Sequence, residues 1–433
     1  GVITADSDCR AALGTVGCRF QQSASLEFSA ADDGESNEQD TITVTVESIV
    51  GGSANDKLTV FKNHDLSCSI SCSFTAPSVA GSLFGGAGAD TLTGPASSSS
   101  PIVFDGGVGN DTIYGSGADD TINAGAGDDA VTAYSGNDVI NGDDGNDNLL
   151  GEDGNDTIAG GSGNDLITGG NGNDTLVGSA GSDTVSYVDH YGAVIASLGD
   201  AQTSGNGTPG VNGLPDENDL IGADVENLTG GSAGDVLNGN SSSNTILGGA
   251  GNDTIVGSGG NDTVSGGDGD DSITTGSGSD TLNGDAGWDT LSGGAGDDVY
   301  SGGADTDNVS YVYSSAPVTA VLGDVPTTGN GISGENDTIN SDVEALVGGS
   351  GADVLKGNSV ANIINGGAGN DTIFGGAGND TLSGADGDDV LDGQAGADFF
   401  NGDAGVDTVT YSSRTGVITA DSDCRAALGT VGC

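Results

Sequence analysis

Aliphatic residues recur at every ninth position over long stretches of the chain, and each one follows an aspartate by two places. The repeating unit reads Gly-Gly-x-Gly-x-Asp-x-aliphatic-x, as in GGAGNDTIF at 366–374. Because side chains alternate between the two faces of a strand, the last three residues predict a short β-strand whose middle side chain points inward. In the first long run the inward position is aliphatic in every unit: Ile113, Ile122, Val131, Ile140, Leu149, Ile158, Ile167, Leu176 and Val185.

The units keep strict register in three runs, at 106–186, 230–310 and 348–410, and two isolated units begin at Gly51 and Gly85. One inward side chain per short strand is too little for a globular core, but it suffices for a solenoid in which successive strands stack. We therefore predict an all-β fold, a parallel β-roll or β-solenoid with β-rich inserts between the runs. Two units should form one coil, so that alternate units lie on the same edge.

A second level of repetition organises the chain. Each run ends in a tyrosine at the same phase, Tyr187, Tyr311 or Tyr411, which we interpret as a cap on the aliphatic stack. A longer insert follows, and the first two inserts share an Asp-Val-Glu segment before Gly-Gly-Ser. The predicted segments are the second half of an insert with a first unit (1–59), an irregular Cys- and Ser-containing insertion (60–105), a first block (106–186), an insert (187–229), a second block (230–310), an insert (311–347), a third block (348–410) and the first half of an insert (411–433).

The sequence also repeats itself at its two ends. Residues 1–18 are identical to residues 416–433, and residues 38–53 match the second half of the insert at 311–347. The chain contains no methionine. We interpret it as one period of a longer tandem array or polymer. The alternative is a protein whose identical ends exchange strands between subunits, and a mass in denaturant near 41.6 kDa would contradict the tandem array.

Composition adds a requirement for cations. The chain has 83 glycines and 65 acidic residues against seven basic ones, which gives a net charge of -58. Such a charge opposes compaction unless counterions are held at defined places. It also disfavours nucleic acid and anionic membranes as partners, and no apolar run is long enough to span a membrane.

The stacking of units turns the aspartates into candidate metal ligands. Carboxylates on adjacent coils would lie roughly 4.8 Å apart and repel by about 3 kcal/mol at an effective dielectric near 20. A flexible cage of carboxylate and carbonyl oxygens suits Ca²⁺, whereas Mg²⁺ requires a tighter octahedron and zinc favours His or Cys. We predict many bound Ca²⁺ ions. In the first run the ligands would be Asp111, Asp129, Asp147, Asp165 and Asp183 on one edge, and Asp120, Asp138, Asp156 and Asp174 on the other.

The nonapeptide resembles the calcium-binding repeat of RTX proteins. The inserts are similar to spacers between RTX blocks of large secreted bacterial proteins. The resemblance implies type I secretion, folding outside the cell and an extracellular or cell-surface location. It also implies that each ion is shared by the position-six carboxylate and by glycine carbonyls of neighbouring turns. The remaining ligands would be Asp253, Asp262, Asp271, Asp280, Asp289, Asp298, Asp307, Asp371, Asp380, Asp389, Asp398 and Asp407.

Four positions depart from the pattern. Asn244 and Asn362 replace the aspartate in the second unit of their runs, so these sites should be weak or empty. Asp235 and Asp353 open their runs and have no regular neighbour on one side. We expect weaker binding there.

The cysteines favour disulfides if the protein is extracellular. Cys9 to Cys18 and Cys68 to Cys72 are the local options, and Cys424 and Cys433 are copies of the first two. The sequence does not decide the connectivity. A metal cluster is the alternative, although no nearby histidine completes a zinc set.

No catalytic arrangement is evident. His64 and His190 lie outside any known catalytic motif, and we interpret both as solvated loop residues. Trp288 occupies position five of a turn, where its ring either has a surface role, such as lateral packing or ligand stacking, or is an exposed side chain without a function. We expect a protein that is not an enzyme.

Three functions agree with these features. The first is a calcium-stiffened segment of an extracellular filament, surface layer or adhesin stalk, whose partners are identical copies. The second is a binding module whose inserts, or whose stretch 60–105, recognise a cell surface or glycan. The third is the calcium-binding tail of a secreted hydrolase.

Overall fold

The computed structural model describes backbone and side chains at 82–95, 99–199 and 219–411, and the backbone of several short strands before residue 82. Every element in these parts of the chain is a β-strand. The chain forms two compact units, one of residues 1–190 and 195–227, the other of residues 191–194 and 228–433. The predicted all-β fold is therefore confirmed for the described residues.

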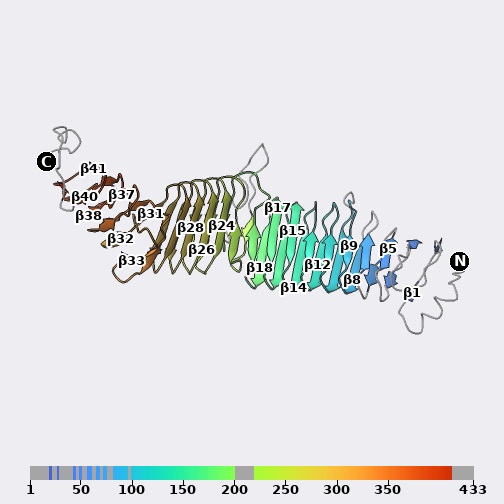
Figure 1. Ribbon diagram of the computed structural model, residues 1–433. Coiled ribbons are helices and arrows are strands. Elements are labelled where there is room, and N and C mark those ends of the chain that lie inside the picture. Colours follow the sequence, from blue (N-terminus) through green and yellow to red (C-terminus); the bar gives the residue numbers. More distant parts are fainter. Residues whose placement is uncertain are drawn as a thin grey trace. The chain divides into compact units, whose positions relative to one another are not determined.

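Strands of the first unit form two parallel ladders (Figure 1). Ile122 pairs with Ile140, and Leu149 with Ile167, so alternate units lie on the same edge as predicted. The first ladder contains β10 (Ile102–Val108), β12 (Thr121–Ala126), β14 (Val139–Asp144), β16 (Thr157–Ser162), β18 (Thr175–Ala180) and, from the insert, β21 (Leu220–Ile221). The second contains β11 (Thr112–Tyr114), β13 (Ala130–Thr132), β15 (Asn148–Asp153), β17 (Leu166–Asn171) and β19 (Thr184–Ser186).

The core is one aliphatic column per ladder. All nine position-eight side chains of the first run are at most 1% exposed. Burial of one such side chain contributes roughly 1.5–3 kcal/mol. A core this thin leaves little to offset repulsion between stacked carboxylates.

Part of the stretch predicted as irregular, 60–105, continues the ladders. Ser82 in β8 (Gly81–Ala87) pairs with Val103, and Leu92 in β9 (Thr91–Thr93) pairs with Ile113. Each pair spans more than two nonapeptides, so this coil is longer than the regular ones. The turn absorbs the extra residues because strand pairing depends only on the register within the strands. Earlier strands are β1 (Arg19–Gln21), β2 (Glu27–Phe28), β3 (Ile42–Val44), β4 (Ser48–Val50), β5 (Asp56–Val60), β6 (Asp65–Cys68) and β7 (Cys72–Thr75).

The second unit contains the second and third runs. In the second run the strands again form two parallel ladders that join alternate nonapeptides. One ladder contains β24 (Thr245–Ala250), β26 (Thr263–Asp268), β28 (Thr281–Ala286) and β30 (Val299–Ala304). The other contains β23 (Val236–Asn238), β25 (Thr254–Val256), β27 (Ser272–Ser277), β29 (Thr290–Ala295) and β31 (Asn308–Ser310).

The insert at 311–347 is β-rich, as predicted, and it continues the stack. Its strand β35 (Ala345–Val347) pairs with β31 on one side and with β37 (Ile363–Asn365) on the other. On the opposite face β34 (Asp337–Ile339) follows β30, and β32 (Val318–Val321) precedes β36 (Val354–Lys356). The strand β33 (Thr327–Ile332) joins β32 and β34 by antiparallel pairing.

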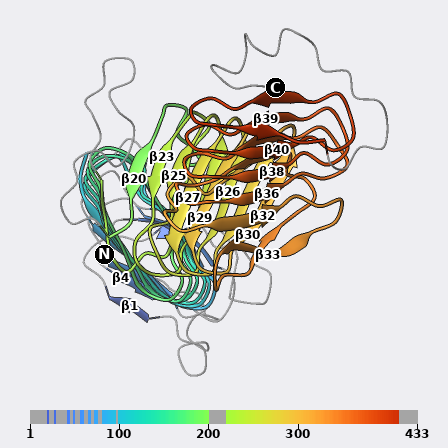
Figure 2. The same ribbon diagram turned by 90° about the vertical axis from the view of Figure 1, so that its left-hand side faces the viewer.

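The third run adds strands in the same order beyond the insert, and Figure 2 shows β36, β38 and β40 following one another. Its ladders contain β38 (Thr372–Phe374), β40 (Val390–Asp392) and β42 (Thr408–Val409), and β39 (Thr381–Ser383) and β41 (Phe399–Asn401). The insert before the second unit contributes β20 (Ile195–Ser197) and β22 (Asn227–Thr229).

Candidate metal sites

The position-six aspartates form continuous columns along the edges of the stack. The backbone N–H of Asp129 donates to Asp147 Oδ1 at 2.8 Å, and the N–H of Asp147 donates to Asp165 Oδ1 at 2.9 Å. The same bond joins Asp271 to Asp289 at 2.8 Å in the second run. Each aspartate thus uses one carboxylate oxygen to bind the preceding coil. We call these rows the aspartate columns.

The second carboxylate oxygen is buried and accepts no hydrogen bond from the described residues at most positions of the columns. A buried carboxylate oxygen in this state requires a cation or a proton. It occurs at Asp111, Asp129, Asp138, Asp147, Asp156, Asp165, Asp183, Asp253, Asp262, Asp271, Asp280, Asp289, Asp298, Asp307, Asp371, Asp380, Asp389 and Asp407, all of which are predicted ligands.

A backbone carbonyl points to the same place as this free oxygen. A Cβ added to Gly142 would lie less than 3.0 Å from Asp147 Oδ2 and from the Gly160 carbonyl oxygen. The same two kinds of oxygen converge at Gly284, from Asp289 and Gly302. The absence of a side chain at position one therefore keeps an oxygen-lined space open between coils.

This donor set fits Ca²⁺. Calcium accepts carboxylate and backbone carbonyl oxygens together in flexible geometry. No group of three or more His, Cys, Asp or Glu side chains converges on one point in the described part of the chain. Backbone carbonyls would therefore have to complete each coordination shell, which argues against zinc.

Burial raises the pKa of many column aspartates, and at several of them the charges of neighbouring aspartates raise it further. The pKa of Asp147 rises to about 7 because of burial and the nearby Asp129 and Asp165 carboxylates, against the hydrogen bond from Asp129. Burial is the main cause throughout. The pKa is also raised to about 7 at Asp138, Asp271, Asp298 and Asp307, and to about 6 at Asp111, Asp129, Asp156, Asp253, Asp262 and Asp371.

In some units the protein bonds both oxygens of the position-six aspartate. Asp235 accepts the N–H groups of Val194 and Gly231, at 2.7 and 2.6 Å. Asp353 accepts those of Val318 and Gly349, at 2.8 and 2.7 Å. These two open their runs, where weaker binding is expected. Asp120, a predicted ligand, accepts the N–H groups of Ile102 and Ser116 at 2.8 and 2.7 Å, so its environment differs from that of the other ligands.

The two asparagines that stand at position six, Asn244 and Asn362, also have a bonded side-chain oxygen. Asn244 Oδ1 accepts the N–H of Asn240, and Asn362 Oδ1 accepts the N–H of Asn358, both at 2.8 Å. An amide supplies no negative charge to a cation. Weak or empty sites at these positions stay a prediction.

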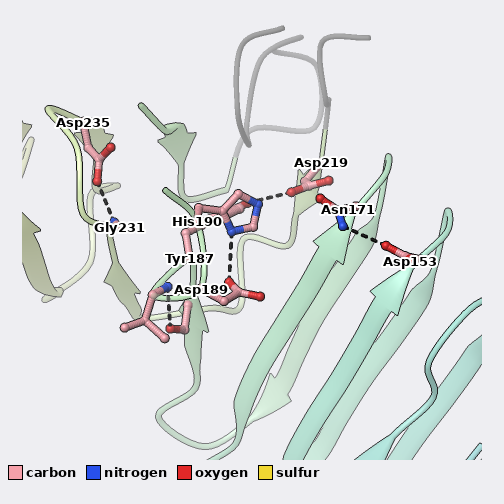
Figure 3. A network of polar contacts seen from close by, with 10 residues as sticks. Asp153, Asn171, Tyr187, Asp189, His190, Asp219, Gly231 and Asp235 are labelled. Atoms are coloured by element: carbon pink, nitrogen blue, oxygen red, sulfur yellow. Dashed lines mark hydrogen bonds and ion pairs between the residues drawn. The ribbon is translucent and has the colours of Figure 1, made fainter. Parts of the chain in front are cut away.

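Tyrosines close one edge of the first and second runs. The Tyr187 hydroxyl donates to Asp219 Oδ2 at 2.9 Å, as Figure 3 shows, while Asp219 Oδ1 accepts the Asp174 N–H at 2.9 Å. In the second insert the Tyr311 hydroxyl donates to Asp337 Oδ2 at 3.0 Å. Tyr187 and Tyr311 are buried at the run ends, as expected of caps. Their hydroxyls supply the donor that the second oxygen lacks within the columns.

Replacing Tyr311 with Phe should therefore destabilise the folded protein. Loss of the donor to the buried Asp337 carboxylate is expected to lower the free energy of unfolding by about 1–3 kcal/mol. Urea denaturation in calcium measures the change. Tyr313→Phe is the control because Tyr313 is 80% exposed. Equal midpoints for the two variants would contradict the cap.

Glycines at position four are needed for close packing of the turns. Gly278 has φ +147°, and a Cβ there would collide with the Gly260 carbonyl oxygen of the preceding coil. Gly334 also has a positive φ, +112°, but nothing lies within 4 Å of its added Cβ. A side chain at either position would strain the backbone, but only one at Gly278 would also collide with a neighbouring coil.

Gly278→Ala is expected to destabilise the protein more than Gly334→Ala. Strain in this φ region costs roughly 1–3 kcal/mol, and only Gly278→Ala adds a collision that must move the backbone. Thermal unfolding in calcium provides the comparison. Similar melting temperatures for the two variants would show that the stack tolerates side chains in its turns.

His190 is buried, contrary to the prediction of a solvated loop residue. It is only 8% exposed, its Nδ1 lies 2.9 Å from Asp189 Oδ1, and its ring packs edge-on against Tyr187 with 5.2 Å between centroids. The interpretation as a solvated loop residue is therefore wrong for His190. The loop folds back because the His190 N–H donates to the Tyr187 carbonyl. The interaction with His190 lowers the pKa of Asp189.

The second histidine, the cysteines and the tryptophan were also candidates for a role. His64 and the side chains of all six cysteines lie outside the described residues, so the disulfide prediction stays open. Trp288 is 64% exposed at position five, in agreement with a surface position.

The predicted ligand set omits one member of a column. Asp90 is 2% exposed, and its N–H donates to Asp111 Oδ1 at 2.6 Å. The unit beginning at Gly85 has the complete motif, but its longer spacing from the next aspartate hides the shared column. The intact GGAGADTLT motif at 85–93 could have identified Asp90 as a ligand from the sequence.

Stacked parallel coils with buried aspartate columns define a class of acidic, glycine-rich β-solenoids. The family model of the RTX calcium-binding nonapeptide repeat matches more than half of the chain, and the chain belongs to this family. The matches cover residues 82–94, 103–131, 126–158, 150–185, 229–264, 256–289, 265–300, 274–309, 347–382 and 374–409. No curated protein matches the chain. Among the described residues there is no helix of the length and apolarity needed to cross a membrane.

Proposed function

We propose that this protein is a calcium-stabilised structural repeat protein, part of an extracellular filament, surface layer or adhesin stalk. Many Ca²⁺ ions would bind along the aspartate columns, each to a position-six carboxylate and to carbonyl oxygens of adjacent coils. Bound ions would neutralise the columns and connect each coil to the next. The stack would then resist extension along its axis.

The observation that supports a structural role most strongly is the continuity of the second unit. Strand β35 of the insert pairs with the last strand of the second run and with β37 of the third. An insert that served as a flexible linker would interrupt this ladder. Here the insert transmits the stack from one block to the next.

Repetition supports identical copies as partners. Residues 1–18 and 416–433 share one sequence, so the modular pattern begins again at the end of the chain. Proteins with RTX repeats are typically secreted. We propose type I secretion of an unfolded chain that folds where calcium is abundant.

Electron microscopy and mass measurement of native material test this function together. We expect filaments in millimolar calcium, and either a mass above one period in denaturant or filaments that dissociate in EGTA. Discrete particles of 41.6 kDa in calcium and in denaturant would overturn the proposal.

A ligand-binding adhesin module is the second candidate, because the second unit exposes aromatic rings. Tyr191 is 90% exposed and Tyr313 is 80% exposed, each in an insert. Exposed aromatic faces suit stacking on sugars or on other apolar surfaces. Glycan-array binding by the wild type, lost in Tyr191→Ala with Tyr313→Ala but kept in Val188→Ala, would favour this candidate over a purely structural role.

A further inference from the structure

After the first and second runs, a glutamate of the insert takes the place that the aspartate of a following coil would have. It lies at the edge opposite to the one closed by the tyrosine. The N–H of Asp307, the last column aspartate of the second run, donates to Glu344 Oε2 at 3.2 Å. In the first run the N–H of Asp183 donates to Glu226 Oε2 at 3.0 Å. Since Ala345 pairs with Asn308, Glu344 stands where the next position-six aspartate would be.

The insert also replaces the carbonyl of the following coil. A Cβ added to Gly302 would lie less than 3.0 Å from Asp307 Oδ2 and from the backbone carbonyl oxygen of Asp342. In regular coils the carbonyl belongs to a position-one residue, as the Gly302 carbonyl does at Gly284. A short segment, Asp-Val-Glu, thus supplies the oxygens that a whole turn supplies elsewhere.

The first run ends in the same arrangement. At Gly178 the converging oxygens come from Asp183 Oδ2 and the Asp224 carbonyl. The two junctions are independent, because one lies in each compact unit. Both Asp-Val-Glu segments lie outside the matches to the nonapeptide family model, which end at 185 and 309 and resume at 229 and 347.

Unsatisfied buried oxygens point into both junctions. Asp183 and Asp307 are both 0% exposed, and the Oδ2 of each accepts no hydrogen bond from the described residues. Asp342 Oδ1 is likewise buried without a hydrogen-bond partner in this part of the chain, while its Oδ2 accepts the Ser301 hydroxyl at 2.9 Å. The second junction therefore contains two acidic side chains, Asp307 and Asp342, that each have one unsatisfied oxygen.

At the opposite edge of the same run, the last acid has a hydrogen-bond donor on its second oxygen. There Asp337 follows Asp298, and the Tyr311 hydroxyl donates to its Oδ2. The junction edge ends instead in a glutamate and a carbonyl, neither of which can donate. The buried Asp307 oxygen at this edge requires a cation or a proton, as in the columns.

We propose that the insert completes the last Ca²⁺ site of each of these two runs, held at the second junction by Asp307, the Asp342 carbonyl and Glu344, and at the first by Asp183, the Asp224 carbonyl and Glu226. This inference rests on the proposed calcium binding of the columns. The ion attaches the insert to the end of the run. Calcium thereby stabilises the passage between blocks as well as the blocks themselves.

Native mass spectrometry of the full chain at pH 7.5 counts the ions directly. Glu344→Gln keeps an acceptor for the Asp307 N–H but removes the charge, so the strand pairing is retained. We expect one ion fewer than in the wild type near half-saturating calcium, with affinity at that site reduced on the order of ten-fold or more. The double variant Glu226→Gln with Glu344→Gln should lack two ions.

Asp324→Asn is the matched control, because it removes one charge from an exposed acid of the same insert. An ion count for Glu344→Gln equal to that of Asp324→Asn would overturn the junction site. If Glu344→Gln loses its far-ultraviolet circular dichroism, Glu226→Gln gives the same comparison in the first unit. Absence of all ions from the wild type would instead refute calcium binding by the columns.

Discussion

Removal of calcium at pH 7.5 is expected to convert the protein from a β-rich stack into an expanded coil, with loss of most of its far-ultraviolet β signal. Adjacent bare carboxylates in a column repel by about 3 kcal/mol, and one buried aliphatic side chain returns only roughly 1.5–3 kcal/mol. The chain also bears a net charge of -58. Without cations, therefore, repulsion cancels the gain from the core before the entropy of ordering the chain is counted.

Circular dichroism and small-angle scattering in EGTA measure this transition. Readdition of Ca²⁺ should restore the signal, because the unfolded chain retains every ligand. Readdition of Mg²⁺ at the same concentration should not, because Mg²⁺ keeps its waters and requires a tighter octahedron. A β signal that survives chelation would refute the calcium-driven fold.

Acidification of the calcium-free protein to pH 5 is expected to restore β structure. The folded-state pKa is raised to about 7 at Asp138, Asp147 and Asp271, against a usual value of 3.8. Between these values the folded state binds more protons than the unfolded state, so the free energy of unfolding falls as the pH rises. This contribution is fully present below pH 3.8 and is lost as the pH passes about 7. Each such group contributes up to about 1.4 kcal/mol per pH unit.

A pH titration from 8 to 5 in EGTA, followed by circular dichroism, measures this effect. Asp271→Asn, which cannot ionise, should shift the folding midpoint to higher pH. Asp268→Asn is the control, because Asp268 is exposed on the surface of the same run. Folding that improves as the pH rises, or a calcium-free chain that stays unfolded at pH 5, would show that protons do not substitute for calcium in the columns.

The repeated parts of the structure could be predicted because their contacts are local in the repeat. A residue of a regular coil meets its equivalents in the coils before and after it, as Ile140 meets Ile122 and Ile158. The nine-residue period thus fixes the pairing, the inward aliphatic column and the aspartate columns together. Asp90 was not predicted because extra residues in one turn interrupt the nine-residue period there, although the strands on either side still pair.

The inserts were less predictable because they have no period. The sequence showed that the two inserts share an Asp-Val-Glu segment and follow a tyrosine at the same phase. Nothing in that comparison indicated that these tyrosines bind the carboxylates of Asp219 and Asp337. The burial of His190 against Tyr187 likewise depends on a loop that folds back on itself.

The sequence alone therefore determined the β-solenoid, its coil of two units, its core and its demand for cations, since each follows from a regular period and a large net charge. Only the tertiary structure decided which carboxylate oxygens remain unsatisfied. Tyr311 reaches Asp337 from the far end of the insert, and Glu344 reaches back to Asp307 in the preceding run. Whether an oxygen meets a hydroxyl, an N–H or an open space depends on such distant partners. No local pattern in the chain specifies them.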